Sequence, residues 1–281
     1  MRRSGLTLVS TLAAAGLLGA SAIGTAAQEP ITIDAASVAI TVDGDASDWA
    51  DVEATAVMLE QLDLSLLPPE QADEIEFGAV DPMEVGLRVA NDADMIYVLL
   101  EVPAPYDYVA DDHGLSPAIA VQAKVEPEAS AHMGSEEDDL FASTGTVDIW
   151  HWELDCGPGE LSGGQGVAGG NDEACNMDDE FSTSPERRED DGGGDDANDT
   201  AENSLVGSWS HSAADIGGDG TWVFEMARPL STGDSQDAAW EAGGIAELVL
   251  AWWDPNETGE GWSDAGHLTN AYDGWITVNL N

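Results

Sequence analysis

Residues 131–152 hold a concentration of side chains that can bind a metal or stack on a flat ligand. Met133 lies in a polar stretch rich in Ser and Glu, where burial in a core is not its obvious role, and a soft sulfur ligand for iron is one alternative. An acidic spacer separates it from the run Trp150-His151-Trp152. Because side chains alternate along a strand, both indoles are predicted to share one face, with His151 on the other.

Other site chemistries find less support in the sequence. There is no Gly-x-Ser-x-Gly run, no phosphate-binding loop, and no His or Cys spacing typical of zinc. Asp43, Asp45 and Asp48 leave calcium open, although their spacing differs from the EF-hand pattern. In so acidic a chain, a loop with three carboxylates is weak support for an ion site.

The N-terminus has the features of an export signal. Arg2 and Arg3 precede an apolar stretch that ends in small residues near Ala27, which predicts cleavage there. The paired arginines resemble a twin-arginine signal, the route for proteins exported already folded. We therefore expect a signal peptide at 1–27, a single domain at 28–281 and a place on the extracytoplasmic face. Uncleaved, the apolar stretch is long enough to tether the chain to a membrane.

The charge balance is extreme. The formal net charge is −49, and all 56 acidic residues follow the signal, which leaves −51 on the mature chain. Such a surface repels nucleic acid and anionic membranes. Abundant acid with very few Lys resembles proteins of extreme halophiles, where salt screens the repulsion. Ten Trp and a hydrophobic share of 43% argue against disorder.

Strand patterns separated by turns dominate the mature chain, and they predict an all-β fold, a β-sandwich. Cys156 and Cys175 are expected to form a disulfide, because the chain is exported. They close the Gly-rich segment 157–174, and a second segment, 186–203, is almost wholly acidic, Gly or polar. Both are predicted surface insertions. The predicted strands are 31–42, 85–89, 95–102, 118–125, 146–154, 221–227, 246–253 and 272–280.

Several short motifs together resemble a known family. In chain order they are 42–44 with 48–49, 94–98, 132–134, 147–152, 222–230 and the closing strand at Trp275. They are similar to the haem b (gamma) subunit of ethylbenzene dehydrogenase and related electron-transfer subunits of dimethyl sulfoxide reductase-like molybdenum enzymes. The resemblance implies a β-sandwich that holds one haem b between a Met and a second axial ligand, which is Lys in the ethylbenzene enzyme.

The resemblance places Met133 at the family's Met position. The family's Lys stands shortly before the final strand, where this chain has His267 instead. We therefore expect iron ligation by Met133 and His267, since imidazole binds iron without first losing a proton from an amine. After His267, His151 is the next candidate for the second axial ligand, and His132 and Lys124 are weaker candidates. The alternatives without a haem are that Met133 is a core residue and that His267 and His151 form hydrogen bonds with the backbone.

Three further residues are expected near the haem. Trp150 and Trp152 are predicted to be core residues or to form the pocket wall. Arg228, in the turn Arg228-Pro229-Leu230, is predicted to fix a strand end, or to pair with a haem propionate.

The function that follows from this resemblance is non-catalytic electron transfer. The haem b would relay electrons to or from a molybdenum-containing catalytic subunit with an iron–sulfur subunit, and contact with the membrane would come only through these partners or an uncleaved signal. Two other classes stay open. A carbohydrate-binding β-sandwich would stack Trp faces on sugar rings, and a structural surface protein would bind neither haem nor glycan.

Overall fold

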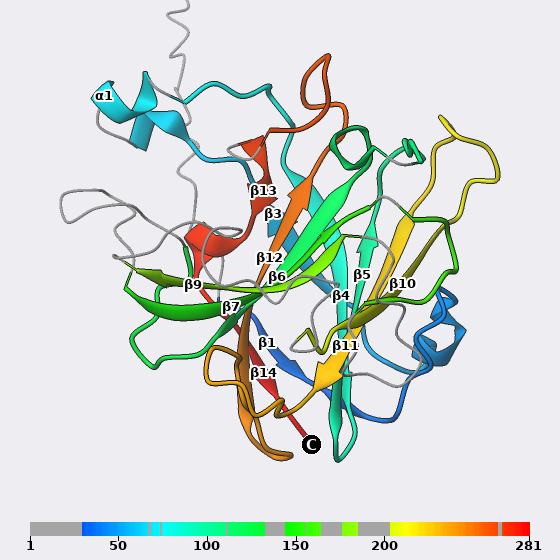
Figure 1. Ribbon diagram of the computed structural model, residues 1–281, viewed down its shortest axis with the longest axis vertical. Coiled ribbons are helices and arrows are strands. Elements are labelled where there is room, and N and C mark those ends of the chain that lie inside the picture. The colour runs from blue at the N-terminus through cyan, green and yellow to red at the C-terminus, as the bar shows by residue number, and fades with distance from the viewer. Residues whose placement is uncertain are drawn as a thin grey trace, which may run out of the picture.

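Two β-sheets stacked face to face form the framework of the protein, here described from a computed structural model (Figure 1). The structure describes residues 30–66, 69–73, 75–110, 112–132, 144–154, 156–163, 176–184, 203–263 and 266–281. Sheet A has the strand order β1-β14-β12-β6-β7-β9, with β13 paired to β12. Sheet B has the order β2-β4-β5-β11-β10-β8, with β3 paired to β4. The predicted β-sandwich is therefore confirmed.

The strands of each sheet have the following bounds. Sheet A comprises β1 (Thr32–Asp34), β6 (Ala118–Lys124), β7 (Gly145–Glu153), β9 (Met177–Ser184), β12 (Ile245–Trp253), β13 (Leu268–Thr269) and β14 (Ile276–Asn279). Sheet B comprises β2 (Ala36–Ser37), β3 (Thr55–Leu59), β4 (Met83–Asn91), β5 (Met95–Val102), β8 (Ser162–Gly163), β10 (Val206–His211) and β11 (Trp222–Pro229).

Helical structure in the described ranges is limited to single turns. They are α1 (Pro69–Ala72) and the 3-10 helices η1 (Ala46–Trp49), η2 (Leu64–Leu66), η3 (His113–Leu115) and η5 (Ala271–Asp273). Among the described residues, none of these helices has the length or hydropathy needed to cross a membrane.

The core lies between the sheets and is rich in aromatic residues. Phe224 of β11 pairs in register with Leu100 of β5, and both face sheet A. Trp150 and Trp152 of β7 enter the same core from the opposite side, and both are completely buried. Aromatic side chains bury large apolar areas, so these indoles contribute strongly to the stability of the sandwich.

The loop before η1 is anchored to the outer face of sheet B. Gly44 has a φ of 78°, and its amide donates to the buried carboxylate of Glu225 at 2.6 Å. The carboxylates of Asp43, Asp45 and Asp48 accept backbone hydrogen bonds within residues 41–48. These oxygens therefore stabilise the turn itself, which accounts for the acidic loop without an ion.

The connection after β7 agrees with the sequence interpretation where the structure describes it. Cys156 is disulfide-bonded, as expected, and Cys175, the other cysteine of the sequence, lies outside the described residues. Most of the two predicted insertions also lies outside them.

Candidate functional site at the rim of the sandwich

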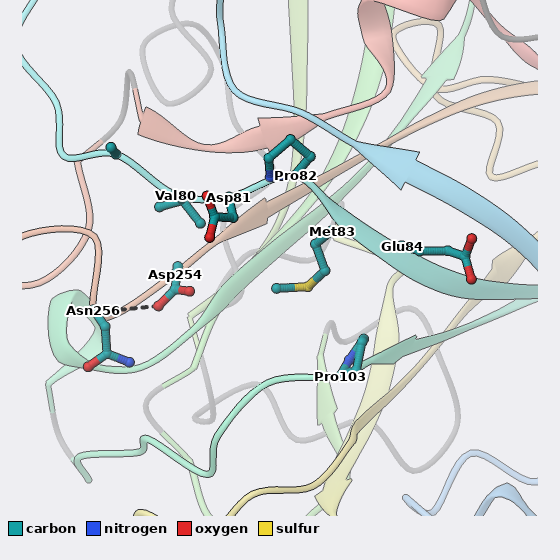
Figure 2. A pocket seen from close by; sticks show the side chains of 9 residues that line it. Val80, Asp81, Pro82, Met83, Glu84, Pro103, Asp254 and Asn256 are labelled. Atoms are coloured by element: carbon teal, nitrogen blue, oxygen red, sulfur yellow. Dashed lines mark hydrogen bonds between the residues drawn. The ribbon is translucent and has the colours of Figure 1, made fainter. Parts of the chain in front are cut away.

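A shallow, open pocket of about 630 Å³ lies at the rim of the sandwich, and we call it the rim pocket (Figure 2). It lies where β4 begins and where β5 and β12 end, so three strands from both sheets position its wall. The lining residues are Ala79, Val80, Asp81, Pro82, Met83, Glu84, Pro103, Asp254 and Asn256.

The lining combines carboxylates, one amide and apolar side chains. Asn256 is held by two contacts. Its backbone N–H donates to Asp254 Oδ1 at 2.8 Å (Figure 2). Its side-chain Nδ2 donates to Asp107 Oδ2 at 2.7 Å. Carboxylate and amide oxygens accept hydrogen bonds from hydroxyl groups, and Met83 supplies an apolar surface beside them. Such a lining suits a neutral polyhydroxyl ligand, whereas an anion would be repelled.

The pocket wall is braced by Gln61. Its Oε1 accepts from the backbone N–H of Val80 at 2.9 Å. Its Nε2 donates to the carbonyl oxygens of Gly78 at 2.9 Å and Gly266 at 2.7 Å. One side chain thus joins the segment before β4 to the loop after β12.

Glu257 makes a second connection between the same two segments. Its carboxylate accepts from the backbone N–H of Gly78 at 2.9 Å, and from the N–H and hydroxyl of Ser263 at 2.6 and 2.8 Å. A Cβ at Gly78 would overlap the backbone carbonyl of Glu257, so that position needs glycine, and a Cβ at Gly266 would displace the Glu257 carboxylate. The loop between β12 and β13 is consequently fixed against the pocket wall.

An aromatic cluster lies on the outer face of sheet A, at the end of β12 that leads into the pocket. Trp253, the last residue of β12, immediately precedes Asp254 of the pocket. Its ring centroid lies 5.0 Å from that of His151, 4.8 Å from that of His267 and 6.1 Å from that of Trp262. We refer to these four residues as the Trp–His cluster.

The four rings of the cluster differ in exposure. Trp253 is only 6% exposed, whereas Trp262 is half-buried. The Nε1 of Trp262 donates to the carbonyl oxygens of His113 and Ser116 at 3.0 and 2.9 Å. These bonds hold the indole in one orientation while part of its surface stays accessible.

The residues predicted around a haem separate onto two sides of sheet A. Trp150, Trp152 and Arg228 point into the core between the sheets, and Arg228 is completely buried among carboxylates. His151 and His267 meet on the outer face, at Trp253. A continuous sheet therefore separates the two groups, and the predicted alternation of His151 with its neighbouring indoles is present.

Only one of the two proposed iron ligands lies within the described residues. Met133 lies outside the described residues, while His132 and His267 lie within them. His267 is half-buried beside Trp253. Lys124, one of the weaker candidates for the axial ligand, forms an ion pair with Glu247 at 3.0 Å and lies over the Trp275 ring.

The rim pocket was not predicted from the sequence. Asp254 and Asn256 belong to a chain with 56 acids, where a single carboxylate gives no signal of its own. The sequence feature that could have indicated this site is the end of the predicted strand 246–253, where aromatic and polar residues follow one another in the run Trp252-Trp253-Asp254-Pro255-Asn256. Polar and aromatic residues at a strand end are placed by the rigid sheet, and that is where binding sites often form.

Comparisons with known proteins give carbohydrate-binding modules as structural neighbours. No family model and no curated protein matches the chain. A family 9 carbohydrate-binding module from Caldicellulosiruptor kristjanssonii, solved with glucose, is 10% identical, with 89% of this chain and 95% of that chain covered at a TM-score of 0.41. The same module solved with cellotriose is 11% identical, with 89% of this chain and 93% of that chain covered at a TM-score of 0.38. A proposed carbohydrate-binding protein from Bacteroides uniformis is 9% identical, with 89% of this chain and 98% of that chain covered at a TM-score of 0.43.

These findings correct the interpretation as a haem subunit. The neighbours are not haem-binding proteins, so the predicted membership in the ethylbenzene dehydrogenase gamma family and the predicted haem b electron transfer are wrong. The structural reason agrees with this correction, because Arg228 and the two indoles lie across sheet A from His151 and His267. At these identities and TM-scores the likeness concerns the fold and does not identify a ligand.

Proposed function

We propose that the protein is an exported, non-catalytic carbohydrate-binding β-sandwich whose site combines the rim pocket with Trp262 of the Trp–His cluster. One observation carries the proposal. Asp254, one of the hydrogen-bond acceptors that line the pocket, directly follows Trp253, the central indole of the Trp–His cluster, in the sequence. Sugars present hydroxyl groups around their edge and C–H groups on their faces. The acceptors of the pocket match the hydroxyl groups, and the accessible indole of Trp262, in contact with Trp253, matches the C–H faces.

The ligand class follows from the charge of the site. Asp81, Glu84 and Asp254 line the pocket of a chain with a net charge of −49. A neutral glycan pays no electrostatic penalty there, whereas a polyanion does. Export, which residues 1–27 predict, would bring the protein to extracellular polysaccharides.

Calorimetric titration with glucose and cellotriose, the sugars bound by two of the structural neighbours, tests the proposal, together with pull-down on insoluble neutral polysaccharides. All measurements belong in high salt, where self-repulsion is screened. We expect wild type to bind at least one neutral glycan, and Trp262→Ala and Asp254→Ala each to weaken binding tenfold or more.

Trp275→Ala is the matched control. Trp275 is also a half-buried indole on the outer face of sheet A, but it lies by Lys124, at the opposite end of β6 from the cluster. This variant should keep the affinity of wild type. A folded wild type that retains no neutral glycan would overturn the function, and full affinity in both site variants would overturn the site.

A further inference from the structure

A cluster of four charged side chains lies buried in the core, apart from the rim site. Arg228 Nη1 lies 2.6 Å from Asp148 Oδ2, 3.4 Å from Asp179 Oδ1 and 3.7 Å from Asp237 Oδ2. Its Nη2 donates to the carbonyl oxygen of Ala238 at 2.6 Å. Arg228, Asp148 and Asp179 come from β11, β7 and β9, so the cluster connects the two sheets.

The charges within this cluster do not balance. Three carboxylates surround a single guanidinium, whose carbon lies 5.1 and 5.4 Å from the ring centroids of Trp150 and Trp240. The side chains of Arg228, Asp148 and Asp179 are completely buried, and that of Asp237 is 6% exposed. Two negative charges are therefore uncompensated away from water, where an unpaired charge is very costly.

Two carboxylate oxygens in the cluster accept no hydrogen bond from the described residues. Asp148 uses Oδ2 for Arg228 and for the backbone N–H of Ala238, at 2.8 Å, and leaves buried Oδ1 unused. The buried Oδ2 of Asp237 likewise accepts no hydrogen bond there, apart from its long ion pair. Polar atoms in such positions call for a ligand, because leaving them unsatisfied costs stability.

We propose that Asp148, Asp179 and Asp237 bind one divalent cation, Ca²⁺ in preference to a transition metal, beside Arg228. A double positive charge brings the cluster to neutrality. One oxygen from each Asp lies within 4.8 Å of the others, a separation that oxygens around one Ca²⁺ can have at ligand distances of about 2.3–2.6 Å. An all-oxygen donor set suits a hard cation.

Protons compete with the cation for the same oxygens. Burial raises the pKa of Asp148 to about 6, against the opposing effect of Arg228, and burial also raises the pKa of Asp179 well above its usual value. Two bound protons would neutralise the cluster as one divalent cation does. Cation binding is therefore expected to release protons and to tighten as the pH rises.

Calorimetric titration of the chelator-treated, full-length protein with CaCl₂ tests the proposal at constant ionic strength set by NaCl. We expect one Ca²⁺ bound per chain, proton release near pH 6 seen as a dependence of the heat on the buffer, and a higher Tm. Tb³⁺ provides a local readout, since the indoles of Trp150 and Trp240 would sensitise its emission and Ca²⁺ should quench it by displacement.

Asp237→Asn is the informative variant, because it removes one charge at nearly constant shape and Asp237 makes only the longest contact with Arg228. We expect at least a tenfold loss of Ca²⁺ affinity and of Trp-sensitised Tb³⁺ emission. Asp215→Asn, at an exposed position, is the control and should behave as wild type.

Two results would overturn the proposal. One is a wild-type protein whose Tm responds to CaCl₂ no more than to NaCl of equal ionic strength. The other is an unchanged Ca²⁺ affinity in Asp237→Asn. If that variant does not fold, the titration and Tb³⁺ emission of wild type still decide the question. Glycan binding is measured separately, so failure of this site leaves the proposed function standing.

Discussion

The indole Nε1 of Trp49 donates a hydrogen bond to Glu225 Oε1 at 2.6 Å and thereby joins η1 to β11, in the middle of sheet B. The amides of Asp43 and Gly44 donate to the other oxygen of the same carboxylate, at 3.0 and 2.6 Å. Burial raises the pKa of Glu225, and these three donors act in the opposite direction. The carboxylate is therefore a satisfied structural anchor.

Glu225→Gln should lower the free energy of unfolding by about 1–3 kcal/mol, because an amide has one acceptor oxygen where three donors need partners. Urea unfolding followed by tryptophan fluorescence measures this loss. Glu241→Gln, at an exposed position, should change stability by less than about 0.5 kcal/mol. Equal stability of the two variants would mean that the anchor contributes nothing.

Stability should decrease with rising pH above about pH 4 in the absence of divalent cations. The folded-state pKa of Asp148 is about 6, above its model-peptide value of 3.8, so the folded state holds the proton more tightly. This contribution is complete below pH 4 and is lost as the pH rises through 6, which amounts to roughly 2–3 kcal/mol for this group. Urea unfolding in high salt at several pH values measures the slope.

Asp148→Asn separates this effect from repulsion over the whole surface. The variant should be less stable, because Arg228 loses its closest partner, but its stability should depend less on pH between 4 and 6. A slope equal to that of wild type would show that general repulsion, not the buried carboxyl, governs the pH dependence.

The strands were predictable to the extent that their side chains alternate. Met95 to Val102 was predicted with the bounds that β5 has, and the interpretation of 118–125 and 146–154 differs from β6 and β7 by single residues. β9 was missed, since its sequence Met177–Ser184 contains three acids in succession and lacks an apolar period. In a chain this acidic, composition hides which carboxylates are buried.

Asp179 and Glu180 illustrate why the buried charges could not be predicted. Both are nearly inaccessible, yet in sequence they look like any other acidic pair. Their environment depends on Arg228 and on His151, which lie 49 and 29 positions away along the chain. The rim pocket depends in the same way on contacts between distant segments, such as Gln61 with Gly266.

Gln61→Ala should weaken glycan binding although Gln61 does not line the rim pocket. The variant removes one acceptor and two donor contacts that join Val80 to the loop after β12. We expect a severalfold loss of affinity and a less favourable binding entropy, because the wall must order on binding. Calorimetry at several temperatures measures both. Gln236→Ala, outside this region, is the control and should bind as wild type does.

Ligand charge should decide which glycans bind at low salt. A neutral glucan should bind with an affinity that barely changes with NaCl, whereas a uronic acid polymer of similar length should bind only at high salt, if at all, because Asp81, Glu84 and Asp254 line the pocket. Affinity electrophoresis in gels that contain either polymer, run at several salt concentrations, measures the difference. Asp81→Asn should reduce the discrimination by removing one charge. Preference for the uronic acid polymer at low salt would contradict the acidic pocket as the binding site, because the repulsion between like charges is strongest under that condition.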